Sequence, residues 1–73
     1  MMSQSDEYFY GTVKAYYPIK GFGFISREKG RDVFFHFRDI EKDEADVFEG
    51  VKVKFLLVSG EKGLKALRIA RVG

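Results

Sequence analysis

The sequence of 73 residues predicts an all-β fold, a small closed or partly open barrel of five short strands. Two observations favour this fold. Short runs of aromatic and β-branched residues alternate with turn residues along the whole chain. Only residues 38–48 could hold a helical turn, and their density of Asp and Glu suits a solvated loop. The length allows one domain.

The first two predicted strands flank a turn that contains the single proline of the chain. Residues 8–17 form a run rich in aromatic and β-branched side chains, which ends at Pro18. Residues 18–21 (PIKG) predict the turn, because Pro and Gly favour turn conformations. Residues 22–26 form the second predicted strand.

Three further strands are predicted after the polar turn at residues 27–31. Residues 32–37 are the third. Residues 51–57 alternate apolar residues with lysine, the pattern of a half-buried strand. A turn at residues 59–63 leads to the last strand, residues 64–72.

Composition limits the kinds of site that the chain can form. It has no cysteine, and its one histidine, His36, makes a zinc site improbable. We therefore expect no metal and no cofactor. Residues 1–7 lack the basic start and apolar stretch of a secretory signal, so we expect a flexible segment there, a domain over residues 8–73 and a cytoplasmic protein. No apolar run is long enough for a membrane span.

Charge is distributed unevenly along the chain. Residues 11–38 carry six basic and two acidic side chains, and residues 51–73 carry six basic and one acidic. Between them, residues 39–50 carry six acidic and one basic. The predicted domain is a basic body with one acidic loop, and a basic surface attracts phosphates.

Residues 20–25 (KGFGFI) are the most informative segment. On a strand Phe22 and Phe24 share one face, while Gly21 and Gly23 share the other. Two rings opposite two glycines would make a poor core, so this pattern indicates an exposed aromatic platform, with the glycines keeping its surface clear for flat-lying nucleotides. The chain has eight Phe and four Tyr, more rings than so small a core can bury.

Residues 33–37 (VFFHF) supply a second aromatic segment. If Val33 and Phe35 fill the core, Phe34 and His36 lie beside the platform. Stacking on aromatic rings is open to every base, because each base has a π-face. Six cations would surround that surface and meet phosphates: Lys14, Lys20, Arg27, Lys29, Arg31 and Arg38.

These two segments, with residues 11–14 (GTVK) and 51–55 (VKVKF), resemble the cold-shock domain family over nearly the whole chain after residue 8. The resemblance implies a five-stranded antiparallel OB-type barrel that binds single-stranded RNA or DNA, as in RNA chaperones and regulators of transcription or translation. By position it implies base stacking on Tyr16, Phe22, Phe24, Phe34, His36 and Phe37, with Lys14 and Lys20 near the backbone. Ala15 stands where the family has tryptophan, so we expect one base subsite fewer.

Other interpretations of the pattern remain open. An RNA-recognition-motif domain fits residues 20–24, but it would need two amphipathic helices that the sequence lacks. A protein-interaction module could use the rings as an apolar docking patch. An enzyme would need convergent carboxylates or a metal site. Tyr8 and Tyr10 could extend the platform, but we favour packing of the first strand for both. We expect a monomer that binds no membrane and no small-molecule substrate, and that is not an enzyme.

Overall fold

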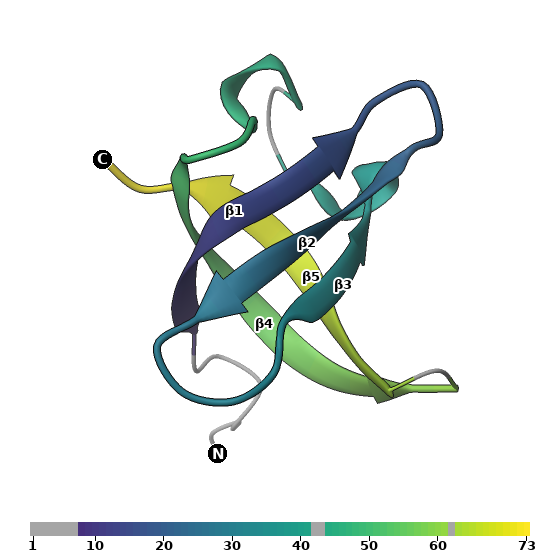
Figure 1. The fold of residues 1–73 in the computed structure, drawn as a ribbon, viewed down its shortest axis with the longest axis vertical. Coiled ribbons are helices and arrows are strands. Elements are labelled where there is room, and N and C mark those ends of the chain that lie inside the picture. The colour runs from purple at the N-terminus through teal and green to yellow at the C-terminus, as the bar shows by residue number, and fades with distance from the viewer. Residues whose placement is uncertain (1–7, 42–43, 62) are drawn as a thin grey trace.

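A computed structural model describes residues 8–41, 44–61 and 63–73 and shows a closed barrel of five strands (Figure 1). The strands and two 3-10 turns follow one another as β1 (Phe9–Tyr17), β2 (Phe22–Arg27), β3 (Val33–His36), η2 (Phe37–Asp39), η3 (Glu44–Asp46), β4 (Lys52–Gly60) and β5 (Gly63–Arg71). The predicted all-β barrel of OB type is confirmed. The expectation for residues 1–7 lies outside the described residues.

Strand pairing closes the barrel in the order β1-β2-β3-β5-β4. Four of the neighbouring pairs are antiparallel, as expected, and the closing pair of β3 with β5 is parallel. That closing pair is short. It joins Phe34 to Lys65, and an isolated bridge joins Ile40 to Ile69 beyond it. Strand β1 pairs with both β2 and β4.

The core consists of inward-facing residues from all five strands and the loop before β4. Its largest fully buried side chains are Phe35, Phe55, Ile25, Ile69, Val13, Val33 and Val53. Val33 and Phe35 are therefore in the core, as the alternation in residues 33–37 predicts. None of the described polar or charged residues is among the buried residues of the core.

A β-bulge at Lys14 changes which residues of β1 face outward. Val13 pairs with Ile25, but the next pair joins Ala15 to Phe24, so Lys14 is an extra residue. The alternation shifts by one residue after the bulge. Tyr16 therefore pairs with Gly23 on the inner face, and Tyr17 pairs with Phe22 on the outer face.

Gly23 serves the core rather than the outer surface. A Cβ atom there would lie 2.6 Å from Cζ of Phe35 and would also clash with the Ala15 carbonyl oxygen. The expectation that this glycine keeps the platform clear is therefore wrong. The space left by its missing side chain lies on the inner face and is filled by the Phe35 ring. Glycine is favoured at position 21 for a different reason, because the backbone there has a φ of +82°, a turn conformation that other residues rarely adopt.

The segment between β3 and β4 contains the two short 3-10 turns, η2 and η3, and no longer helix is described there. In η2 the Asp39 carboxylate accepts a hydrogen bond from the His36 backbone N–H at 3.3 Å, which fixes the chain as it leaves β3. No helix among the described residues is long and apolar enough to cross a membrane.

Candidate nucleic-acid interface

Three phenylalanine rings form a cluster on the outer face of β2 and β3, and we call this cluster the platform. Phe22 and Phe24 come from β2, and Phe34 comes from β3 directly opposite Phe24. Ring centroids lie 6.1 Å apart for Phe22 and Phe24, and 5.9 Å apart for each of the other two pairs. Phe34 is 37% exposed and the other two are half-buried. Each ring therefore packs on its neighbours and still offers surface to solvent.

Further rings continue the platform at the end of the barrel near the β1–β2 turn. His36 pairs with Phe22, and its imidazole lies tilted against the Phe37 ring, with the centroids 5.2 Å apart. Phe37 is 43% exposed and begins η2 rather than ending β3. The Phe37 N–H donates to the Gly21 carbonyl at 2.9 Å, which fixes the ring beside the turn.

The structure places Tyr17 rather than Tyr16 beside the platform, whereas the family resemblance implied base stacking on Tyr16. Tyr16 packs against the core, with its ring 5.5 Å from Phe35, so the structure does not bring it to the platform. Tyr17 is 47% exposed and lies 5.4 Å from Phe22. The bulge at Lys14 causes this difference, and sequence analysis missed Tyr17 because neither glycine nor proline marks the bulge.

Ala15 faces outward beside Phe24, at the edge of the platform. Ala15→Trp is expected to tighten binding of a long oligothymidine by up to about 1–3 kcal/mol, because an indole would add a stacking surface there. A shorter oligothymidine confined to the three platform rings should bind unchanged. Paired titrations of both lengths against both proteins measure the difference. Equal affinities for the long strand, with the variant folded, would refute the added subsite.

Lys14 projects from the bulge and forms an ion pair with Asp32, with Nζ and Oδ2 2.8 Å apart. The hydrogen bond that Lys14 donates to Asp32, and then the negative charge of Asp32, raise the pKa of the exposed Lys14 ammonium above its ordinary value. Lys14 lies next to Ala15, the residue that pairs with Phe24. Asp32 was not among the residues that the sequence indicated.

Strand β5 is less available to phosphate than its basic sequence suggests. Lys65 lies 3.6 Å from the Asp39 carboxylate, and Arg68 forms a 2.7 Å ion pair with Glu41. Arg68 also adopts a positive φ of 52°, which is uncommon outside glycine. The start of the acidic segment therefore offsets the cations on this side of the barrel.

The other cations near the platform lie in turns. Lys20 is exposed in the β1–β2 turn, and Arg38 donates to Nδ1 of His36 at 3.4 Å. Arg27 bonds the Arg31 carbonyl at 2.9 Å and so braces the β2–β3 turn. Of the predicted site residues, the structure brings together Phe22, Phe24, Phe34, His36 and Phe37. Lys14 lies on the bulge of β1 and Lys20 in the β1–β2 turn, and Tyr16 packs against the core instead.

A hollow of about 510 Å³ borders the platform on its β5 side. Phe24 and Phe34 form one wall, and Leu64 and Lys65 form part of the other. Leu64 is exposed and adds apolar surface next to Phe34. Among the described residues, no three His, Asp or Glu side chains are grouped so that they could hold a metal ion.

A five-stranded barrel that exposes a cluster of aromatic rings on adjacent strands defines a class, the OB-type binding barrels. Comparison with known families assigns the chain more narrowly, because residues 9–72 match the model of the 'Cold-shock' DNA-binding domain. This chain belongs to the cold-shock domain family.

Relatives from several bacteria support the assignment. The chain is 51% identical over 57 residues to the major cold shock protein CspA of Pseudomonas aeruginosa, covering 77% of this chain and 83% of the relative. It is 45% identical over 62 residues to the cold shock protein CspC of Bacillus subtilis, covering 84% and 94%. A solved structure of Drosophila Unr CSD456 superposes with a TM-score of 0.78 at 26% identity, covering 92% of this chain and 27% of that one.

Proposed function

We propose that this protein binds single-stranded RNA or DNA with little sequence preference, by stacking bases on Phe22, Phe24 and Phe34. The observation that carries the proposal is three rings in mutual contact at 5.9–6.1 Å that remain open to solvent on one sheet face. Exposed apolar clusters of this kind mark binding surfaces, and aromatic rings accept any base. Membership in the cold-shock domain family supports the same function.

His36 and Phe37 extend the stacking surface, and Lys14 and Lys20 contact the backbone or base edges in this proposal. Tyr17 takes the place that the sequence had assigned to Tyr16. The protein acts as a cytoplasmic monomer and a binding module without a catalytic step. Stacking that tolerates any sequence suits an RNA chaperone, which holds many different strands unpaired.

A single strand is expected to bind more tightly than a duplex of the same sequence, because bases must unstack to lie on the platform. Binding should also weaken with salt, with log K falling by about 0.7 per phosphate contact for each unit of log salt. Titration of fluorescent oligonucleotides, single- and double-stranded, across a range of salt concentrations measures both effects.

Equal affinity for single strand and duplex would exclude the platform as the binding surface. Complete loss of binding at high salt would mean that charge alone holds the ligand. Absence of any nucleic-acid binding, with rings that capture an apolar peptide instead, would favour a protein-interaction module.

A further inference from the structure

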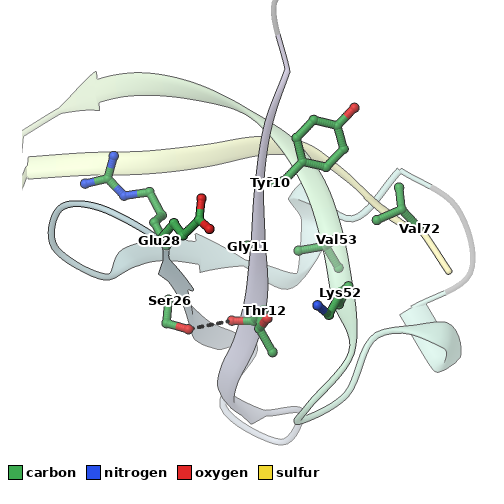
Figure 2. A pocket seen from close by; sticks show the side chains of 9 residues that line it. Tyr10, Gly11, Thr12, Ser26, Glu28, Lys52, Val53 and Val72 are labelled. Carbon is green, nitrogen blue, oxygen red and sulfur yellow. Dashed lines mark hydrogen bonds between the residues drawn. The ribbon is translucent and has the colours of Figure 1, made fainter.

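We infer that a bound single strand continues beyond the platform into a second contact site, which we call the Tyr10 groove, built from Tyr10, Thr12, Ser26 and Lys52. The inference rests on the proposed binding of single strands and adds a subsite to it. The groove is a hollow of about 400 Å³ between β1, the end of β2 and the start of β4 (Figure 2). Its size lies within the range of ligand sites.

Tyr10 is the first reason to expect a ligand there. The ring is 63% exposed, so the expectation that it packs on the first strand is wrong. Figure 2 shows it standing at the rim of the hollow, on the side of Val53 and Val72. An exposed tyrosine offers a flat apolar surface with a hydroxyl at its tip, and bases stack on such rings.

The groove is continuous with the platform along the outer face of the sheet. On β2, Ser26 follows Phe24 on the same face, and its hydroxyl donates to the Thr12 carbonyl at 3.3 Å. Thr12 pairs with Ser26 on one side and with Lys52 on the other. A strand that leaves Phe24 beside the Lys14 bulge therefore reaches Tyr10 along the outer face of β1 and β2.

The distribution of charge favours a path of the bound nucleic-acid strand along the Tyr10 groove over a path toward β5. Lys52 lines the groove, and none of the salt bridges among the described residues involves it. Arg27 also lines the groove. Two carboxylates lie on the path, Asp32 in its pair with Lys14 and Glu28 at the wall of the groove. On the opposite side, Asp39 and Glu41 form ion pairs with Lys65 and Arg68 of β5.

The test uses the absence of tryptophan from the native chain. Tyr10→Trp places a single indole in the groove, and Phe34→Trp places one on the platform as the matched reporter. Oligothymidines of about 6 and about 12 nucleotides fall within the site sizes of OB folds. We expect the longer strand to quench both reporters, and the shorter strand to quench only the platform reporter.

Affinity gives a second readout. Tyr10→Ser and Lys52→Gln should each weaken binding of the longer strand, Tyr10→Ser by roughly five- to tenfold, and leave the shorter strand unaffected. Tyr10→Phe should retain binding, because the ring does the stacking. The exposed Ile19→Ser, in the β1–β2 turn, serves as a control for loss of surface apolar area.

The outcomes separate this inference from the proposed function. If the longer strand quenches the platform reporter but not the groove reporter, the continuation is refuted and the platform stands. Quenching of neither reporter refutes both. If Tyr10→Ser changes self-association without nucleic acid while affinities stay equal, the groove is a contact between copies of the chain, and the inference fails.

Discussion

Phe55→Ala is expected to lower the free energy of unfolding by about 3–5 kcal/mol, the usual cost of truncating a buried phenylalanine. The ring is fully buried between strands, and its centroid lies 6.5 Å from that of Phe9. A single domain of this size is stable by roughly 5–15 kcal/mol at most, so the loss is a large fraction of the whole. Urea denaturation followed by circular dichroism measures it.

Two companion variants keep this result interpretable. Val58 lies on the same strand but is partly exposed, so Val58→Ala should shift the unfolding midpoint far less than Phe55→Ala does. Phe55→Leu removes less volume and should give an intermediate loss if Phe55→Ala is already unfolded without denaturant. An unchanged midpoint for Phe55→Ala would contradict the placement of this ring in the core.

The double variant Phe22→Ala with Phe34→Ala is expected to lose roughly 2–6 kcal/mol of binding free energy for a single strand, from about 1–3 kcal/mol per stacked base. The two ring centroids lie 5.9 Å apart, so the losses should not add strictly. The fold should survive, because solvent already reaches both rings. Titration with a short oligothymidine and thermal unfolding of the same samples measure the two effects.

The single variants complete the cycle, and Ile19→Ala is the control because that side chain is 98% exposed outside the ring cluster. Unaltered affinity in the folded double variant would show that bases do not stack on the platform. Loss of the folded state instead would show that the rings act mainly as core.

The sequence predicts the barrel and the centre of the platform because both follow from strict alternation. The register that places Phe24 opposite Phe34 and Phe22 opposite His36 is the one expected when Val33 and Phe35 point inward. Strand ends were less predictable: β4 extends to Gly60, beyond the apolar run that defined it.

Features that depend on contacts distant in sequence could not be predicted. The bulge at Lys14 turns Tyr16 to the inner face and Tyr17 to the outer face, and no local residue type marks the bulge. The ion pair of Lys14 with Asp32 joins residues 18 positions apart. Tyr10 pairs with Lys54 of β4, 44 positions along the chain, and its ring is 63% exposed. Each is a property of packing rather than of a local pattern.

The short parallel junction of β3 with β5 has a consequence for local unfolding. Fewer paired positions hold this junction than any other in the barrel, so it is where partial opening costs least and where amide hydrogens should exchange first. Phe34 belongs both to this junction and to the platform. A base that stacks on Phe34 in the closed barrel favours that state over the open one. Ligand binding and slowed exchange of the β3 and β5 amides are then two measurements of one equilibrium.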